Sequence, residues 1–221
     1  SSVTRSTAPV IAQAVESAAS PQVRNAASAA GNLLQRPRCW YYRLESYKCV
    51  KKGGDVCYAV AGENRYNVIF GGGPAFPTHP SSAAVPLVAY GASFVLDGPK
   101  GPRTVPAAEF FVLPAKDPTR ENVLQPGEVL LEIRVPSTKG WKSAYLEARE
   151  RAAFDWALAS AAVALKVEGG VVKDARVVLG QVATIPWRAS AAEKALVGQP
   201  VGAASAEAGS LPEVTPSPHP P

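Results

Sequence analysis

The chain has 221 residues, of which 47% are hydrophobic and 19% charged, which suits one large globular domain or two small ones. No apolar run is long enough to predict a membrane span, and the first twenty residues lack the pattern of a signal peptide. The net charge is +5, and the first 60 residues contain eight Lys/Arg but only three Asp/Glu. Such a segment attracts anions such as nucleic acid, a phosphorylated cofactor or an acidic partner, or is a solvated basic loop.

The predicted elements begin with helices. Apolar spacing predicts a helix over residues 8–19. Ser20 then fits an N-cap with proline at the first helical position, and Gly31-Asn32 is predicted to end this second helical stretch. Residues 36–78 are rich in glycine, proline and charge, and we predict mostly loop there.

The middle of the chain predicts strands around one short helix. A helix with serine at its start is predicted over 79–92, and "SFVLDG" and "RTVPAAEFF" predict a hairpin pair. Residues 127–136, "GEVLLEIRVP", are typical of a strand that stops at proline. After Trp141 the alanine-rich sequence favours helix by propensity. Gly169-Gly170 between two apolar runs is a hairpin signal, however, so we predict two long antiparallel strands.

The C-terminal part predicts one helix and a tail. Residues 190–198, "SAAEKALVG", carry a capping box from Ser190 to Glu193 and a terminal Gly198. Residues 201–221 are rich in alanine, serine and proline. Because they hold few large apolar groups to bury, we predict that this tail is disordered.

All three cysteines, Cys39, Cys49 and Cys57, lie within nineteen residues. The odd number argues against a secreted disulfide framework. The spacing lacks the paired C-x2-C of zinc ribbons and offers one thiolate fewer than the usual four of an iron–sulfur cluster. His79 is the internal candidate for a fourth ligand. From spacing alone, a metal or cluster site, a disulfide with one thiol left over and chance clustering all stay open.

Other chemical motifs are weak. The glycine-rich segments at 28–32 and 70–74 would let backbone N–H groups approach a phosphate. Neither is a G-x-G-x-x-G or Walker motif, and each alone is more typical of a turn. His79 has no nucleophile elbow beside it, and no paired-carboxylate motif is visible. We therefore predict no hydrolytic site.

Four collinear segments between about Ala18 and Pro200 resemble motifs of one family. They are "ASPQVRNAASAAGNLLQRPRCWYYR", "HPSSAAVPLVAYGA", "PGEVLLEIRVP" and "KSAYLEARERAAFDWALASAAVAL…GQVATIPWRASAAEKAL". The family is that of the FAD-binding subunits of molybdenum hydroxylases, which includes xanthine dehydrogenase and aldehyde oxidoreductase. The resemblance implies an α+β fold. Residues 1–136 would be the second part of a PCMH-type FAD-binding domain with an inserted cysteine loop over 36–78, and residues 140–200 a small C-terminal domain with an antiparallel sheet and helices. Compared with the family, we expect a piece truncated at both ends.

The resemblance also implies which residues bind FAD. Each is carried over from a family motif at a helix start, in a loop or on a strand beside the cofactor: Ser28, Gly31, Asn32, Gln35, His79, Ser81, Ser82 and Leu130. Three positions depart from the family. Ser82 replaces an aspartate that contacts the flavin, Ala30 replaces a glycine, and Glu147 stands where a lysine is frequent.

In the branch of the family that oxidises aldehydes or reduces aromatic thioesters, the inserted loop binds a [4Fe-4S] cluster through four cysteines. Cys39, Cys49 and Cys57 match the first three metal ligands, whereas the fourth position is Ala75. Alanine cannot ligate iron. The resemblance therefore leaves three outcomes open: no cluster, a cluster on three thiolates, or another fourth ligand.

The resemblance implies an electron-transfer flavoprotein subunit with no catalytic residue of its own. It would relay electrons from a molybdopterin-binding large subunit, through a [2Fe-2S] small subunit, to FAD, and the complex would oxidise aldehydes. The alternative is a degenerate subunit that docks partner chains without flavin, which the departures at Ala30, Ala75 and Ser82 favour. No nucleic acid partner is expected. The compartment would be the cytoplasm or, if a partner's export signal carries the chain, the periplasm.

Overall fold

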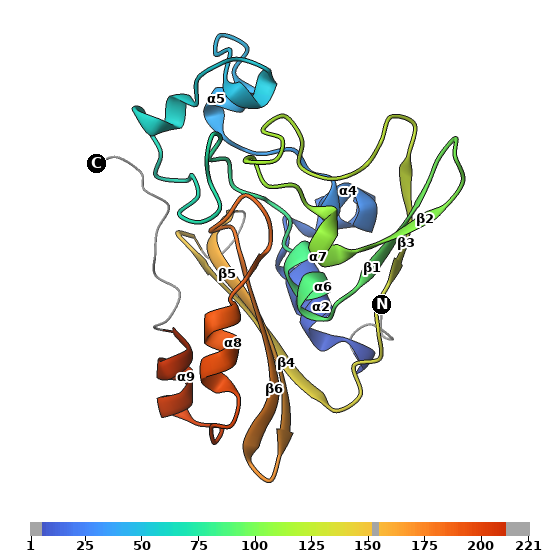
Figure 1. Cartoon of the computed structure of the whole chain (residues 1–221), viewed down its shortest axis with the longest axis vertical. Coiled ribbons are helices and arrows are strands. Elements are labelled where there is room, and N and C mark those ends of the chain that lie inside the picture. The colour runs from blue at the N-terminus through green and yellow to red at the C-terminus, as the bar shows by residue number, and fades with distance from the viewer. Residues whose placement is uncertain (1–5, 152–154, 211–221) are drawn as a thin grey trace.

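The computed structural model describes residues 6–151 and 155–210. Its strands form a three-stranded sheet in the order β2-β1-β3 and a four-stranded sheet in the order β4-β5-β6-β7 (Figure 1). The strands are β1 (Ser93–Asp97), β2 (Arg103–Pro106), β3 (Val129–Arg134), β4 (Trp141–Arg149), β5 (Ala157–Glu168), β6 (Val171–Gly180) and β7 (Trp187–Arg188). The helices are α2 (Pro9–Ser17), α3 (Pro21–Ala26), α4 (Ala29–Leu33), α5 (Trp40–Arg43), α6 (Ala84–Ala89), α7 (Ala107–Phe110), α8 (Ser190–Leu196) and α9 (Ala203–Ser210), with 3₁₀ turns η1 (Val50–Lys52) and η2 (Tyr58–Val60).

The N-terminal helices form where capping residues predict them. Helix α2 confirms the helix predicted over 8–19, and Ser20 caps α3 by accepting a hydrogen bond from Val23 N (3.3 Å). The prediction that Gly31-Asn32 ends this stretch is wrong, because both residues lie inside α4. The chain breaks earlier, at extended residues between α3 and α4, and Ser28 starts the new helix.

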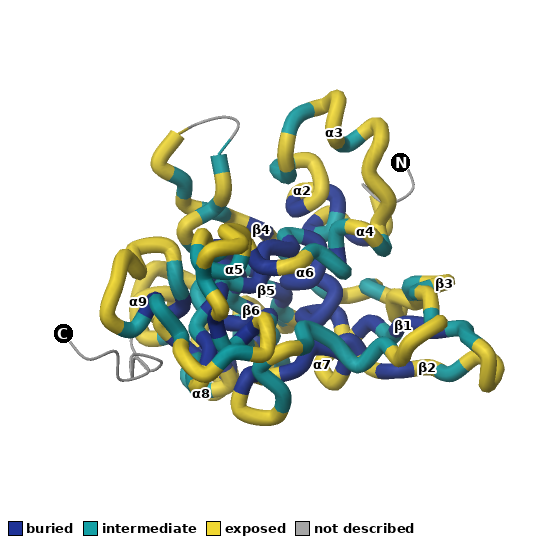
Figure 2. Tube along the Cα trace, turned by 90° about the horizontal axis from the view of Figure 1, so that it is seen from above, coloured by how far each residue is buried: buried dark blue, intermediate teal, exposed yellow. Residues whose placement is uncertain are grey.

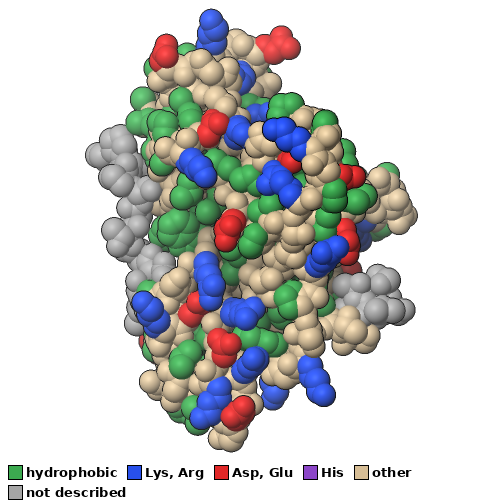
Figure 3. Space-filling view, turned by 45° about the vertical axis from the view of Figure 1, so that its right-hand side comes forward, with side chains coloured by type: hydrophobic (Ala, Val, Ile, Leu, Met, Phe, Trp, Pro, Cys, Tyr) green, Lys and Arg blue, Asp and Glu red, His purple; other side chains and the backbone are tan. Residues whose placement is uncertain are grey.

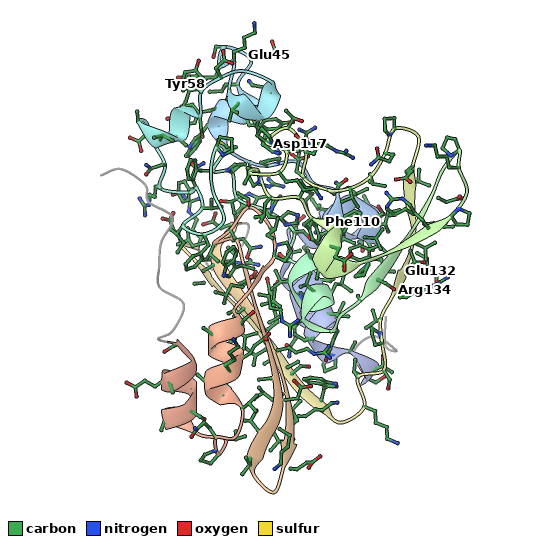
Figure 4. All side chains as sticks on the ribbon, viewed as in Figure 1. Glu45, Tyr58, Phe110, Asp117, Glu132 and Arg134 are labelled. Atoms are coloured by element: carbon green, nitrogen blue, oxygen red, sulfur yellow. The ribbon has the colours of Figure 1, made fainter. Side chains whose placement is uncertain are left out.

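The cysteine loop, residues 36–78, forms a lobe at one end of the molecule (Figure 1). Apart from α5, η1 and η2 it is irregular, as predicted. Glu45 and Tyr58 lie in the outer part of this lobe (Figure 4). The rings of Tyr41, Tyr47 and Tyr58 contact one another with centroids 5.0–5.9 Å apart, so aromatic packing holds the lobe together locally.

The basic charge predicted before residue 60 is partly neutralised by ion pairs. Lys51 is buried, and its Nζ lies 2.9 Å from Glu121 Oε1. Arg36 Nε lies 2.9 Å from Glu121 Oε2. Figure 3 shows Lys and Arg side chains interspersed with acidic and hydrophobic ones over the visible face. The excess charge therefore does not form one free basic patch on that face.

The elements predicted for the middle of the chain are confirmed in part: α6 covers 84–89 of the predicted 79–92, and the predicted strand "RTVPAAEFF" is wrong for Ala107–Phe110, which form the helix α7. Every residue of α6 is buried. Strand β1 pairs antiparallel with β2, as the hairpin prediction requires, and with β3 on its other edge. Side chains on one side of this sheet join the main core, whereas Glu132 and Arg134 pair with each other on its outer side (Figure 4).

The two long antiparallel strands predicted after Trp141 are β5 and β6. Both glycines of their turn have positive φ, 56° at Gly169 and 78° at Gly170. A two-residue turn with positive φ at both positions matches the right-handed twist of the strands. The turn therefore outweighs the helix propensity of the alanines.

The C-terminal helix α8 is confirmed, but its predicted capping box is wrong. Ala189 is the N-cap and makes no side-chain cap. Glu193 instead accepts hydrogen bonds from Val177 N (2.9 Å) and from Arg188 Nε (2.9 Å). The predicted disorder over 201–221 is wrong for 203–210, which form α9 against α8; residues 211–221 lie outside the described residues.

The main hydrophobic core joins the first sheet, the helices α2, α4, α6 and α7 and one face of the second sheet, whereas a smaller cluster packs α8 on the other face (Val172, Ala175, Val177, Ala189, Ala192 and Leu196). Helices α2 and α6 pack on one face of the four-stranded sheet and α8 on the other (Figures 1 and 2). The buried set contains Val10 and Leu33 from the N-terminal helices, Phe94 from β1, and Ala162 and Val178 from β5 and β6. Among the described residues, no helix is long and apolar enough to cross a membrane.

Candidate functional site

Asn32 and Ser81 tie α4 to the start of α6. Ser81 Oγ donates to Asn32 Oδ1 (2.7 Å) and accepts from Ala84 N (3.0 Å). Asn32 Oδ1 also accepts from Ala83 N (3.3 Å). Since Ser81 is fully buried, its hydroxyl is used inside the protein. The structure therefore gives Asn32 and Ser81 a positioning role, in which they fix α4 relative to the start of α6.

Ser28 and Gly31 form the first turn of α4. Ser28 Oγ accepts a hydrogen bond from Gly31 N (2.9 Å), and both residues are exposed. A Cβ at position 31 would lie 3.0 Å from Ser28 Oγ. Glycine at this position thus keeps the cap intact and leaves the first-turn backbone accessible, which a dinucleotide phosphate requires.

His79 is buried next to this pair, with 4% exposure. Its Nδ1 accepts from Ser81 N (3.4 Å), and its ring packs edge-on against Phe111 at 4.7 Å. Burial, with a smaller contribution from the Lys51 charge, lowers the pKa of His79 to about 3, so the ring is neutral with its proton on Nε2. Nε2 has no hydrogen-bond partner among the described residues. A buried donor of this kind calls for a ligand or water partner.

Asn32, Ser81 and His79 form a hydrogen-bonded cluster, and the remaining residues predicted to bind FAD contact it to different extents. Gln35 Nε2 donates to Asn32 O (3.0 Å), so Gln35 belongs to the cluster. Ser82 follows Ser81 directly in the chain and is half-buried. Leu130, on β3, is partly buried against the main core and has no direct bond to the cluster. The structure thus brings six of the eight predicted residues into one hydrogen-bonded group, with Ser82 beside it and Leu130 separate from it.

Tyr145 is a buried residue that the sequence did not single out. Its hydroxyl donates to Glu147 Oε2 (3.1 Å), and burial raises the pKa of Tyr145 to about 12. Glu147 also pairs with Arg149, which bonds to Ser17 O. Glu147, noted only as a departure from the family, is thus an internal partner of two side chains. The alternation of strand β4 predicts which side chains point inward, but not these partners.

The three thiols do come together. Cys39, Cys49 and Cys57 line one small cavity with Ala75, and burial raises the pKa of the Cys57 thiol. The volume of this cavity is about 10 Å³, at the lower limit for one water molecule. Among the described residues, no group of three or more His, Cys, Asp or Glu side chains is arranged to hold a metal ion. The residues present therefore do not fit a [4Fe-4S] cluster.

The residues around α4 and α6 do fit FAD. The first turn of α4 is exposed around Gly31, whose own N–H is held by Ser28 Oγ, and the unpaired His79 Nε2 offers a buried donor. The fixed Asn32–Ser81 pair holds these two features at constant separation. Because they combine an open helix start with an unsatisfied donor, they suit a large polar cofactor.

Comparison with known proteins identifies the family. A family described as the FAD-binding domain in molybdopterin dehydrogenase matches residues 1–138. The chain belongs to this FAD-binding family. The CO dehydrogenase flavoprotein C-terminal domain matches residues 143–211. The resemblance and the α+β fold class inferred from the sequence are thereby confirmed.

Two curated relatives illustrate the range of the FAD-binding family. The chain is 37% identical over 190 residues to the aldehyde oxidoreductase FAD-binding subunit PaoB of Escherichia coli, covering 85% of this chain and 58% of PaoB. It is 31% identical over 192 residues to the carbon monoxide dehydrogenase medium chain of Hydrogenophaga pseudoflava, covering 86% of this chain and 50% of that relative. The chain thus spans between half and three fifths of these relatives.

A solved structure supports the same fold. It is the carbon monoxide dehydrogenase from Hydrogenophaga pseudoflava that lacks the Mo-pyranopterin moiety of the molybdenum cofactor. Its similarity to this chain has a TM-score of 0.65 at 30% identity and covers 95% of this chain and 57% of that one.

Proposed function

We propose that this chain is the FAD-binding, electron-transfer subunit of a molybdenum hydroxylase complex. The observation that carries the proposal is the family match over residues 1–138, together with a hydrogen-bonded cluster that holds six of the eight carried-over residues. In this proposal the substrate is oxidised on another chain, and no residue of this chain acts as an acid, base or nucleophile.

The chain's own residues bind and orient the cofactor in this proposal. Asn32 and Ser81 fix α4 against the start of α6, Gly31 leaves the first turn of α4 accessible, and His79 offers a neutral N–H donor at Nε2. When bound, FAD supplies the one- and two-electron chemistry. Because His79 stays neutral across physiological pH, it donates a hydrogen bond without adding charge beside the flavin.

The partners and substrate class follow from the relatives. PaoB is a subunit of an aldehyde oxidoreductase, and the cysteine loop resembles that branch. We therefore propose a molybdopterin-binding large subunit and a [2Fe-2S] small subunit as partners, aldehydes as substrates, and either the cytoplasm or the periplasm as the compartment. Because Ala75 replaces the fourth cysteine, we propose no electron-transfer step through the cysteine loop.

The test is the flavin content of the chain purified with its partner subunits. We expect about one flavin per complex, released by acid and identified by its absorption spectrum. His79→Phe removes the Nε2 donor but keeps an aromatic ring against Phe111, and we expect it to weaken flavin retention. A folded complex without flavin would instead support the degenerate docking subunit.

A further inference from the structure

A cavity of about 580 Å³ lies between the cysteine loop and the ends of β4, β5 and β6. Its volume is typical of small-molecule sites. None of the eight residues predicted to bind FAD lines it. We call it the Gln181 cavity and define it by its central lining residues, Trp40, Tyr66, Trp156, Leu158 and Gln181.

The apolar lining of the Gln181 cavity is aromatic and exposed. Trp40, Tyr66, Trp156 and Leu158 are between 41% and 48% exposed. Trp40 and Tyr66 meet edge-on at 5.7 Å, whereas Trp156 comes from the start of β5, far along the chain. Aromatic faces brought together from two segments suit a flat ring that stacks between them.

Gln181 forms the polar end of the cavity. Gln181 is 7% exposed, and its side-chain Oε1 has no hydrogen-bond partner among the described residues. Its backbone has φ = 61°, a left-handed conformation that is uncommon for a residue other than glycine. A strained backbone and an unsatisfied buried acceptor are both unfavourable, and such features concentrate at ligand sites.

The charged lining is weakly positive. The lining has a net charge of +1, because it contains three arginines and two acidic residues (Arg38, Arg43, Arg65, Glu150 and Asp155). Arg65 pairs with Glu150. Arg38 lies over the ring of Trp156, and among the described residues neither Arg38 nor Arg43 has a carboxylate within ion-pair distance. One negative charge on a ligand would balance this lining.

We propose that the Gln181 cavity binds a planar aromatic molecule with one negative charge and an O–H or N–H donor. Its ring stacks among Trp40, Tyr66 and Trp156, and its donor reaches Gln181 Oε1 when the buried side-chain amide turns toward the cavity. Its anionic group lies near Arg38 and Arg43, where a charge-assisted hydrogen bond is strong. This site goes beyond the proposed flavin role. Arg38 Nη2 also donates to Gln35 Oε1 (3.1 Å), which links the cavity to the hydrogen-bonded group around Asn32.

The probe for the test is 6-hydroxy-2-naphthoate, which carries the ring, the donor and the charge. Its binding to the chain in its complex is measured by calorimetry, beside 2-naphthoate, which lacks the hydroxyl, and 2-naphthol, which lacks the carboxylate. We expect each of these two controls to bind about three- to tenfold more weakly, because each loses one polar interaction. Equal binding of all three, or no binding of the hydroxynaphthoate, overturns the proposal.

Gln181→Gly separates the polar contact from folding. Glycine adopts the positive φ at no steric cost, so the variant should fold while losing the acceptor. We expect it to bind the hydroxynaphthoate and 2-naphthoate equally. A preference for the hydroxyl that survives in this variant overturns the assignment of Gln181.

Two matched leucines locate the binding. Leu158 lines the cavity, whereas Leu146, on the neighbouring strand, is 77% exposed outside it. We expect Leu158→Ala to weaken binding several-fold and Leu146→Ala to leave it unchanged. Flavin is measured in the same samples. Release of FAD by the probe would show that the cavity is part of the flavin site and overturn the proposal, whereas a complex without flavin that still binds the probe supports it.

Discussion

At the scale of single residues, Asn32 has a larger structural role than its place in a glycine-rich motif suggests. Its Oδ1 accepts two hydrogen bonds, from Ser81 Oγ and Ala83 N. Asn32→Ala leaves the buried Ser81 hydroxyl without its acceptor, so we expect the free energy of unfolding to fall by about 1–3 kcal/mol. Urea denaturation measures this. Asn25→Ala, at an exposed position in α3, should change it by less than about 0.5 kcal/mol. Equal effects would contradict the positioning role.

His79 predicts acid sensitivity. Burial lowers its pKa from 6.5 to about 3, so between these values the unfolded chain binds a proton that the folded chain excludes. The stabilisation is therefore fully present above pH 6.5 and is lost as pH falls towards 3. Between pH 7 and pH 5 we expect the free energy of unfolding to fall by about 2 kcal/mol from this residue.

His79→Gln checks the origin of that acid sensitivity. Glutamine cannot take up the proton, so denaturation curves of the variant should lose this part of the pH dependence between pH 7 and pH 5. A wild-type protein whose stability is constant over that range, or a variant that keeps the full slope, would show that His79 is not the group responsible.

The sequence predicted which residues lie together around Asn32 and Ser81 better than it predicted their contacts. Gly31 and Asn32 were expected to end a helix and present groups to FAD, yet Asn32 turns inward to Ser81, 49 positions away. Gln181 gave no signal at all, because its unusual φ and its unpaired oxygen depend on segments distant in sequence. The thiols were recognised as a group because they are close in the sequence.

At the scale of elements, prediction succeeded where local rules decide the structure. The Gly169-Gly170 turn places β5 and β6 side by side, with one register shift after Lys166, and Ser20 with the following Pro21 starts α3. Prediction failed at α8, because the Glu193 side chain does not cap its own helix and instead accepts hydrogen bonds from β6 and from Arg188. Such tertiary competition for a capping residue cannot be seen in local sequence.

The cysteine loop is held to the body by the buried Lys51. Its Nζ pairs with Glu121 and donates to Pro118 O (3.2 Å) and Arg120 O (3.1 Å). This segment around Asp117 lies against the lobe (Figure 4). Lys51→Met leaves the two carbonyls unpaired and Glu121 with Arg36 alone, and we expect a loss of about 3 kcal/mol in the free energy of unfolding and faster proteolysis of the loop.

Lys52 provides the matched control for Lys51. It is the next residue, is exposed, and in the described part of the chain donates to Leu44 O (2.7 Å) within the lobe. Lys52→Met should leave both urea denaturation and the rate of loop cleavage close to those of the wild type. If the two variants behave alike, the buried ion pair does not hold the loop.

Ala75 decides whether the loop holds a metal cluster. It lies with the three thiols at one cavity, so Ala75→Cys supplies a fourth ligand at that place. Metal–thiolate bonding provides enough free energy to reshape a small loop. After anaerobic reconstitution we expect about four additional iron atoms and sulfides per chain in this variant, and none in the wild type.

Ala61→Cys tests whether position matters for that gain. Ala61 is exposed in the same loop and does not line the cavity. Iron and sulfide analysis should show no gain for this variant. Bound iron in the wild-type loop, beyond that of the partner subunits, would contradict the conclusion that its residues do not fit a cluster.

At the scale of the whole molecule, the two family-matched regions share one core. Tyr145 N, on β4, donates to Gln13 Oε1 on α2 (2.9 Å), and Tyr90 and Ser143 hydrogen-bond across the same junction (2.7 Å). Val10 of α2 belongs to the same buried cluster as Ala162 of β5. The C-terminal region has a small cluster of its own around Val172 and Leu196, but the other face of its sheet is buried against the N-terminal region. We therefore expect the described part of the chain to unfold in one cooperative transition.

Val10→Ala tests this cooperativity. Val10 is 1% exposed, and the cavity left by the substitution should lower the free energy of unfolding by about 2 kcal/mol. Two probes report on the two regions: the reactivity of the buried Cys49 thiol and the fluorescence of tryptophans, three of which lie after residue 138. Both urea midpoints should shift together, whereas Val15→Ala, at a position 43% exposed on the same helix, should move neither. A shift confined to the thiol signal would show that the C-terminal region folds independently, and the shared core would then not be what couples the flavin cluster to the second sheet.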